Sequence, residues 1–176
     1  EQTLAMKEKR ITLDRRTPSR GRREWARPIN VGRGELAPRN IAEVYAQQAE
    51  WIHENPTVEV VLQAVRIGDL GITAMPTETY GITGLKLKRQ SPLAATFNLE
   101  LSNGAVGYIP PPEQHRLGGY TTWPARTAGL SEQSEPEIVE TLLGLLETVR
   151  GNQRRAIVDP EMPYSEKIVQ KQPLAY

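Results

Sequence analysis

Apolar residues recur at helical spacing in the segment from Ile41 to Ile52. Asn40, just before it, is a good N-cap, because its side chain can accept a hydrogen bond from a free N–H of the first turn. Pro56 follows shortly after the last apolar position and cannot continue a helix. The pattern therefore predicts a helix over 41–52.

A second helical repeat lies near the end of the chain. It opens on Ser134-Glu135-Pro136-Glu137, which has the form of a capping box with proline in the first turn. It continues to about Arg150, and Gly151 follows as a typical helix stop. We expect a helix over 134–150, with Ser134 as its cap.

Between these helices, runs of β-branched and alternating residues favour strands. The predicted strands are 57–67, 70–75, 95–101 and 106–109. Gly68-Asp69 joins the first two as a turn, which indicates a hairpin. The segment 80–88 favours a helix, although Gly81 and Gly84 weaken that prediction.

Strands interleaved with helices predict an α/β fold with a mixed β-sheet flanked by helices. We expect this α/β unit to occupy residues 40–158. Residues 159–176 contain prolines and no period, so they are expected to form an extended tail. The loop over 113–130, rich in Gly, Thr and aromatic residues, is expected to be ordered but irregular.

Residues 1–39 differ from the rest in charge. They hold 11 Lys and Arg against 5 Asp and Glu, a balance of +6, whereas the remaining 137 residues have a balance of −5. With prolines and glycines among the arginines, this segment is expected to be a basic irregular arm. Two interpretations stay open: an arm that binds phosphates or anionic lipid, or an extended connection that packs over a partner surface. No aromatic ladder or repeated basic motif accompanies the charge, so no nucleic-acid partner is expected.

Composition excludes several classes of chemistry. The chain has no cysteine, which removes disulfides, thiolate metal sites and cysteine nucleophiles. Its only histidines are His53 and His115, too few for a self-contained multi-histidine metal site. No apolar run approaches the roughly 18 residues of a transmembrane helix. The chain starts at Glu1 without a signal-like segment, and we expect it to be a piece of a longer protein.

Three residues could carry chemistry in the most irregular part of the chain. Glu78 follows a strand end, where α/β folds often place ligands, or it caps the next helix. Tyr108 precedes a triple proline and is either functional or half-buried packing. Tyr120 follows two glycines and can equally be a loop anchor. Residue types and positions alone do not decide between these interpretations.

The stretch from Val65 to Leu130 resembles the later part of the catalytic domain of neutral/alkaline non-lysosomal ceramidases, especially bacterial ceramidase-like proteins. The carrying motifs are Ile67-Gly-Asp-Leu-Gly-Ile-Thr-Ala-Met-Pro-Thr-Glu78, then Asn103-Gly-Ala-Val-Gly-Tyr108-Ile-Pro-Pro-Pro-Glu113, then Tyr120, twelve positions after Tyr108. The interval from Glu78 to Tyr108 is shorter than in the family. Residues 113–115 read Glu-Gln-His where the family has an acidic pair and a tyrosine.

The resemblance implies that Glu78 and Tyr108 bind zinc and that Tyr120 donates a hydrogen bond to the reacting carbonyl. It also implies two histidine ligands and further catalytic groups, which this chain lacks. We therefore expect the N-terminal half of the same enzyme, absent here or on another chain, to complete a Zn²⁺-dependent amidohydrolase. Such an enzyme would hydrolyse an N-acyl amide or a ceramide-like substrate. The resemblance also indicates a secreted or periplasmic location.

The alternative is a non-catalytic ceramidase-like binding or surface protein that kept the fold. Two further residues carry open interpretations. His115, seven residues after Tyr108, is either an extra ligand or a loop histidine. Trp123 is either a packing residue or part of a substrate cleft.

Overall fold

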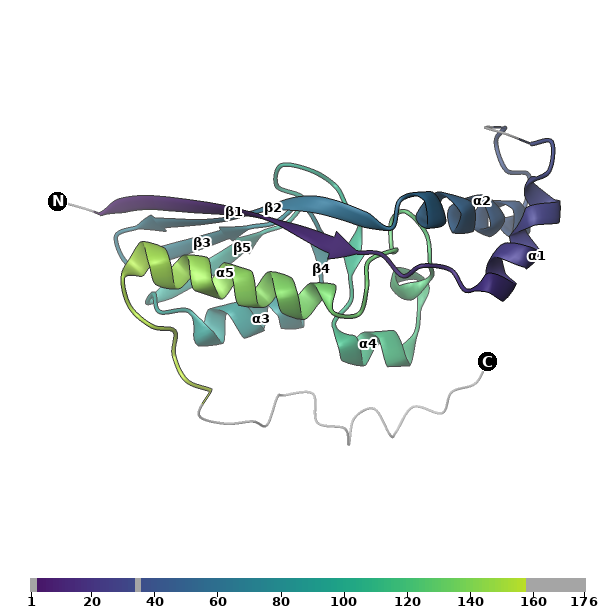
Figure 1. Cartoon of the computed structure of the whole chain (residues 1–176). Coiled ribbons are helices and arrows are strands. Elements are labelled where there is room, and N and C mark those ends of the chain that lie inside the picture. The colour runs from purple at the N-terminus through teal and green to yellow at the C-terminus, as the bar shows by residue number, and fades with distance from the viewer. Residues whose placement is uncertain (1–2, 34–35, 158–176) are drawn as a thin grey trace.

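The structure is a computed structural model that describes residues 3–33 and 36–157. It confirms a mixed α/β architecture, with a four-stranded sheet flanked by helices (Figure 1). The strands are β1 (Leu4–Asp14), β2 (Thr57–Ile67), β3 (Leu70–Ala74) and β5 (Ala95–Leu99), in the order β1-β2-β3-β5. The β1–β2 and β2–β3 pairs are antiparallel, and β3–β5 is parallel. The predicted hairpin at Gly68-Asp69 is therefore confirmed.

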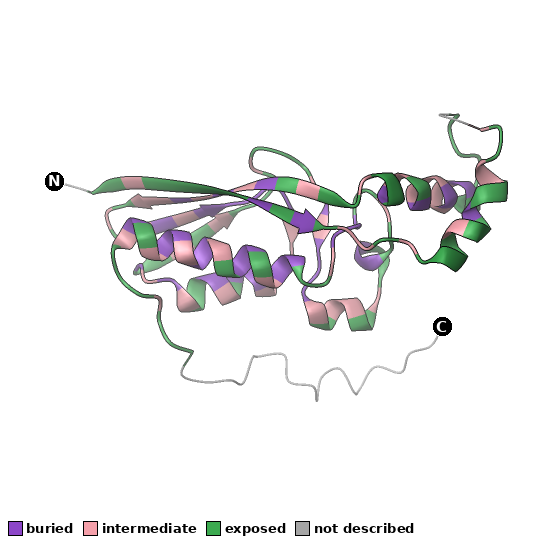
Figure 2. Cartoon of the chain, viewed as in Figure 1, coloured by how far each residue is buried: buried purple, intermediate pink, exposed green. Residues whose placement is uncertain are grey.

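Two helices cover one face of this sheet. Helix α5 (Ser134–Arg150) packs against β1, β2 and β3, and helix α3 (Gly81–Gln90) packs against β5 and α5. Figure 2 shows buried residues concentrated where α5 meets the sheet. The core is made of large aliphatic side chains, among them Leu13, Leu62, Leu87, Ile138, Leu142 and Leu146. Burial of such side chains is the dominant favourable term in folding.

The opposite face of the sheet is also apolar at one end. Because side chains alternate across a strand, residues between the buried positions point away from α5. Two adjacent rows of register partners on this face contain only apolar residues: Leu4, Ile67, Leu70 and Ala95, and then Met6, Val65, Ile72 and Phe97. Several of them are largely exposed, up to 75% for Leu4. We call these eight residues the open sheet face.

A pair of helices extends from one end of the sheet. Helix α1 (Arg20–Asn30) packs against α2 (Ile41–Glu54), and their contact is built from small side chains, Ala26, Ala46 and Ala49. Asn40 caps α2 as predicted, with its side chain accepting from the Glu43 N–H at 3.0 Å. We refer to α1 and α2 as the helix pair.

The expectation of an irregular segment over residues 1–39 is wrong for most of its length. Residues 4–14 form an edge strand along the whole of β2, and 20–30 form α1. The strand was missed because its inward residues, such as Ile11 and Leu13, are spaced among charged residues that face water. Whether 1–39 and 40–158 are separate units stays a prediction.

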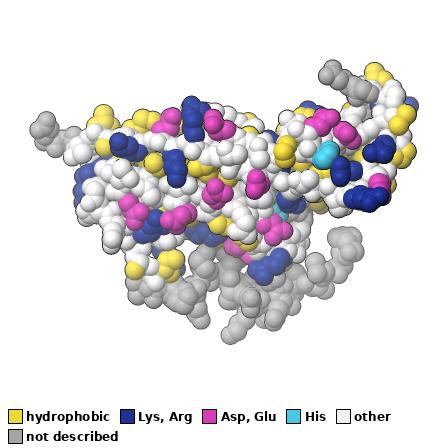
Figure 3. Space-filling model, viewed as in Figure 1, with side chains coloured by type: hydrophobic (Ala, Val, Ile, Leu, Met, Phe, Trp, Pro, Cys, Tyr) yellow, Lys and Arg dark blue, Asp and Glu magenta, His cyan; other side chains and the backbone are white. Residues whose placement is uncertain are grey.

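Two arginines of this segment donate hydrogen bonds to backbone carbonyls of distant segments. Arg15 donates to the Asn55 carbonyl at 3.1 Å, and Arg16 donates to the Leu130 carbonyl at 3.1 Å. On the face drawn in Figure 3, basic and acidic side chains are interspersed rather than gathered by sign. The two interpretations of this segment, an arm for anions or an extended connection over a partner surface, stay predictions.

Other details differ from expectation at element ends. The loop over 113–130 contains helix α4 (Pro112–Leu117) and a 3₁₀ turn, η1 (Tyr120–Thr122). The predicted capping box is wrong: Ser134 is already helical, its hydroxyl bonds to Ser131, and the N-cap position is Gln133. The predicted strand over 106–109 is reduced to β6 (Tyr108–Ile109). The expected tail over 159–176 lies outside the described residues.

Candidate functional site

The chain leaves β3 and enters a second, very small sheet. Strand β4 (Glu78–Thr79) pairs in parallel with β6, and Glu78 is the register partner of Tyr108. Directly after β3, Met75 donates its N–H to the Leu99 carbonyl at 3.1 Å, which positions the connection from β3 to β4. Glu78 therefore follows the carboxyl ends of the parallel strands β3 and β5, the edge where α/β folds commonly bind ligands.

Gly107 allows the chain to approach this small sheet closely. Its φ is +101°, in a region that L side chains rarely adopt, and a Cβ there would overlap the Thr127 carbonyl. Its own carbonyl accepts from the Glu78 N–H at 3.0 Å, while Tyr108 N–H donates to the Thr127 carbonyl at 2.8 Å. One glycine thus holds Glu78, Tyr108 and the loop around Thr127 together.

The 3₁₀ turn η1 brings Tyr120 to the same place. The Tyr108 and Tyr120 rings meet edge to face, with centroids 5.5 Å apart and planes at 88°. The next residue, Thr121, shares a 2.6 Å hydrogen bond with the Tyr80 hydroxyl, which ties η1 to the start of α3. Tyr120 is 65% exposed, whereas Tyr108 and Glu78 are half-buried.

The phenol of Tyr108 is the centre of this cluster. A hydrogen bond with Tyr120 raises the pKa of Tyr108 to about 12, and a hydrogen bond with Glu78, desolvation and the negative charge of Glu78 act in the same direction. The phenol is therefore protonated at neutral pH. The structure thus brings together Glu78, Tyr108 and Tyr120, three residues from three separate elements.

The two histidines lie elsewhere in the fold. His53, in the last turn of α2, contacts Arg23 at 2.9 Å through its Nε2. His115 lies in α4, and burial lowers the pKa of its imidazole, with the nearby charge of Arg16 acting in the same direction. Its buried Nε2 has no hydrogen-bond partner among the described residues. Among the residues that the structure describes, neither histidine forms a hydrogen bond or an ion pair with Glu78.

A metal at this cluster would need more donors than Glu78 and Tyr108 supply. A carboxylate and a phenolate are both acceptable oxygen ligands for Zn²⁺, but zinc sites in proteins usually take four ligands that include nitrogen or sulfur. Within residues 3–33 and 36–157, no three His, Cys, Asp or Glu side chains are grouped to hold a metal ion. The donor set therefore fits zinc only as one part of a site.

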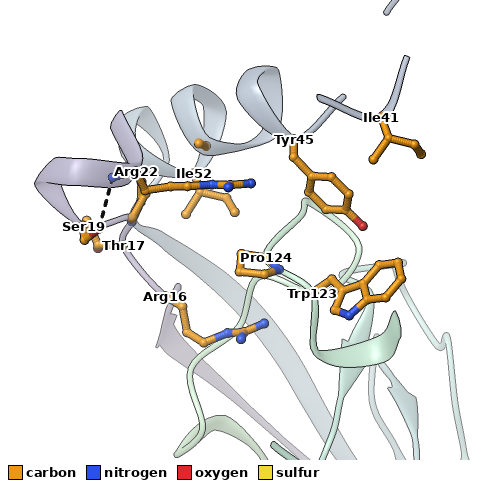
Figure 4. A pocket seen from close by; sticks show the side chains of 11 residues that line it. Arg16, Thr17, Ser19, Arg22, Ile41, Tyr45, Ile52, Trp123 and Pro124 are labelled. Carbon is orange, nitrogen blue, oxygen red and sulfur yellow. Dashed lines mark hydrogen bonds between the residues drawn. The ribbon is translucent and has the colours of Figure 1, made fainter. Parts of the chain in front are cut away.

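A groove of about 640 Å³ lies beside this region, between the helix pair and the loop that follows η1 (Figure 4). It is lined by Arg16, Thr17, Pro18, Ser19, Arg22, Ile41, Tyr45, Ala49, Ile52, Trp123 and Pro124. Trp123 meets the Tyr45 ring edge to face at 6.1 Å. The sequence indicated Trp123 as a possible cleft residue but missed Arg16 and Arg22, which looked like members of a generic basic segment. The signal that could have found Arg22 is Ser19, whose side chain caps α1 by accepting from the Arg22 N–H.

No helix in the described ranges is long and apolar enough to cross a membrane. Export from the cell stays a prediction from the resemblance.

Comparison with known proteins gives weak likenesses of the fold only. No family model matches the chain, and no curated protein matches it. Among solved structures, the chain is similar to a ceramidase in complex with C2, with 13% identity over 61% of this chain and a TM-score of 0.47. It is also similar to the neutral ceramidase from Pseudomonas aeruginosa, with 12% identity over 59% of this chain and a TM-score of 0.47. In both cases the match covers 18% of the other chain, so this chain spans less than a fifth of those enzymes.

Proposed function

We propose that this chain supplies part of the active site of a zinc-dependent amidohydrolase resembling neutral ceramidase. In this proposal Glu78 and Tyr108 are metal ligands and Tyr120 is a hydrogen-bond donor to the amide carbonyl. Histidine ligands come from sequence outside the chain, and the substrate is an N-acyl amide. The observation that carries the proposal is the meeting of the three side chains, which are separated by up to 42 positions in sequence, at the carboxyl edge of a parallel strand pair.

Each residue of the cluster has a distinct part in the proposed chemistry. When bound, zinc supplies an activated water and Lewis-acid polarisation of the amide carbonyl. Glu78 provides a carboxylate fixed by its backbone bond to Gly107. Tyr108 must release its proton to become a ligand, and its raised pKa makes that release unfavourable until a cation is present.

Tyr120 is the residue suited to contact the substrate. Its ring is positioned by the edge-to-face contact with Tyr108, yet most of its surface is exposed. Its hydroxyl can exchange its hydrogen bond with Tyr108 for one to a carbonyl oxygen that gains negative charge. One such donor is typically worth about 3 kcal/mol of transition-state stabilisation.

The proposal is tested by titrating the completed enzyme, in which sequence outside this chain supplies the histidine ligands, with Zn²⁺ and recording tyrosinate absorbance in the near ultraviolet. We expect absorbance to rise as one proton is released per bound zinc, and zinc affinity to increase with pH. Tyr108→Phe should abolish the tyrosinate signal, and Glu78→Gln should weaken zinc binding at least about tenfold. Tyr120→Phe should leave the tyrosinate signal and should lower only the turnover of an N-acyl amide by the completed enzyme.

The competing candidate is a non-catalytic ceramidase-like protein in which the same three side chains only hold the loop to the sheet. The pairing of β4 with β6 and the edge-to-face contact of the two tyrosine rings, which already join these residues to one another, favour this candidate. It predicts that Glu78→Gln destabilises the fold but leaves zinc binding unchanged. Equal zinc affinity in the wild type, Glu78→Gln and Tyr108→Phe would contradict the metal proposal.

A further inference from the structure

The groove beside the helix pair has an apolar wall that follows one stripe of α2. Ile41, Tyr45, Ala49 and Ile52 are spaced by three and four residues, so they line one side of the helix. From Ile41 to Ile52 this stripe is about 16 Å long at 1.5 Å per residue. Trp123 and Pro124 face it from the loop after η1 (Figure 4). The wall is thus long, narrow and apolar.

The charged groups of the groove come from the connection between β1 and α1. Arg16, Thr17 and Ser19 line this side, and Arg22 joins them from the first turn of α1. In Figure 4, the Arg16 and Arg22 side chains both extend toward the side where Tyr45 and Trp123 lie. The first turn of α1 contains no acidic residue, so the positive end of its dipole adds to the two guanidinium charges.

Neither guanidinium forms a direct ion pair within the described part of the chain. The ion pairs formed by those residues include neither Arg16 nor Arg22. Arg16 is half-buried and donates to the backbone carbonyls of Ala128 and Leu130. Burial lowers the pKa of Arg16, and the charge of Glu132 acts in the opposite direction. Arg22 stacks over the Trp25 ring at 4.0 Å. Two guanidinium groups on an apolar groove whose lining contains no carboxylate favour an anion from outside.

We propose that the groove binds a single-chain aliphatic carboxylate. Its head lies between Arg16 and Arg22, and its hydrocarbon chain runs along the α2 stripe toward Trp123. A linear chain fits because the apolar wall extends in one direction, and a carboxylate fits because Arg16, Arg22 and the N-terminus of α1 all border the groove. The volume is within the range of small-molecule sites. The groove is lined by none of Glu78, Tyr108 and Tyr120. The proposed binding therefore does not depend on whether the proposed metal cluster catalyses a reaction.

Isothermal titration calorimetry of the 176-residue chain with dodecanoate below its micelle concentration tests the proposal. We expect one binding site, weaker binding of octanoate, and no saturable binding of dodecyltrimethylammonium, which has the same chain with a cationic head. Arg22→Gln should weaken dodecanoate binding about tenfold, because a charged hydrogen bond is lost. Arg22→Lys keeps the charge and should restore most of the affinity.

Matched variants separate binding from folding. Arg20→Gln also removes an arginine from α1, but Arg20 pairs with Glu24 at 2.7 Å and does not line the groove, so affinity should be unchanged. Trp123→Ala should weaken dodecanoate more than octanoate, because it shortens the apolar wall. Glu78→Gln should bind dodecanoate as the wild type does, which distinguishes this site from the metal cluster. Absence of saturable binding, equal affinity for the cationic analogue, or equal affinity in Arg22→Gln would each overturn the proposal.

Discussion

Two regions of the molecule are stabilised by different interactions. One is the body, which consists of the four-stranded sheet with α3 and α5. The other is the helix pair, α1 and α2. The body buries large aliphatic side chains in one continuous core. The buried cluster between the two helices consists of three alanines. Polar contacts add to it, such as Glu43 with Arg33 and Arg39 and the Asn30 side chain on the Ala46 carbonyl. Apolar area is the main source of stability, so the body should unfold as a unit while the helix pair opens at lower free energy.

This difference bears on both proposed sites. Glu78, Tyr108 and Tyr120 are anchored to the ends of the body, where Gly107 and Tyr80 fix their backbone and neighbours. The groove, in contrast, has one wall on α2 and another on the loop after η1. Geometry at the metal cluster should therefore follow the stability of the body, whereas the groove should change with the position of the helix pair.

The largest effect is expected from Leu142→Ala in α5. Leu142 is fully buried in the core of the body, and removing its side chain leaves a cavity, which should lower the free energy of unfolding by about 3 kcal/mol. Thermal unfolding followed by circular dichroism measures the change. Leu85→Ala, at a position 49% exposed on α3, is the control and should change stability by less than about 0.5 kcal/mol. Similar losses for both variants would show that the core of the body is not where stability resides.

A smaller effect is expected from Ala46→Leu in α2. Ala46 is fully buried between the two helices, so a larger side chain forces them apart at a cost of about 2 kcal/mol. Hydrogen exchange should show faster exchange in α1 and α2 and unchanged exchange in α5. Ala42→Leu, at an exposed position of the same helix, should leave both unchanged. Equal acceleration in α5 would mean that the two regions unfold together.

The smallest effect is expected from titrating Glu43. Its hydrogen bond from the Arg39 side chain lowers the pKa of the carboxyl, with the backbone N–H of Arg39 and the charge of Arg33 acting in the same direction. A depressed folded-state pKa stabilises fully above the unfolded value of about 4.3 and is lost as pH falls below it. The protection of α2 amides against hydrogen exchange, taken relative to their intrinsic rates at each pH, should therefore fall as the pH drops below about 4. Glu43→Gln should lack this step relative to the control Glu50→Gln, and a step retained in Glu43→Gln would assign it to another group.

How far the sequence predicts this molecule differs between the two regions. The spacing of apolar residues and the flanking cap and turn residues indicate four elements, β2, β3, α2 and α5. The structure places them within a few residues of the predicted positions. Strand β1 was missed because charged residues on an edge strand dilute its apolar period. Helix α1 was missed because it buries one alanine and is otherwise arginine-rich.

The candidate site was predictable only in part. The resemblance indicated Glu78, Tyr108 and Tyr120, and the structure brings them together, although their roles stay proposals. No local pattern reveals that Gly107 lies against the Thr127 carbonyl, because that contact joins segments 20 positions apart. The groove likewise depends on Arg16, Tyr45 and Trp123 meeting from three distant segments. Such sites are properties of the tertiary fold rather than of any window of sequence.

The open sheet face has a consequence for every measurement made on the free chain. Antiparallel strands that face water normally carry polar residues on that side, but the two rows of the open sheet face are apolar throughout. Each square ångström of that surface left hydrated forgoes roughly 25 cal/mol relative to the same surface kept dry. Melting curves recorded in dilute buffer therefore understate how firmly this fold holds once a complementary surface excludes water from Leu4, Val65 and Phe97.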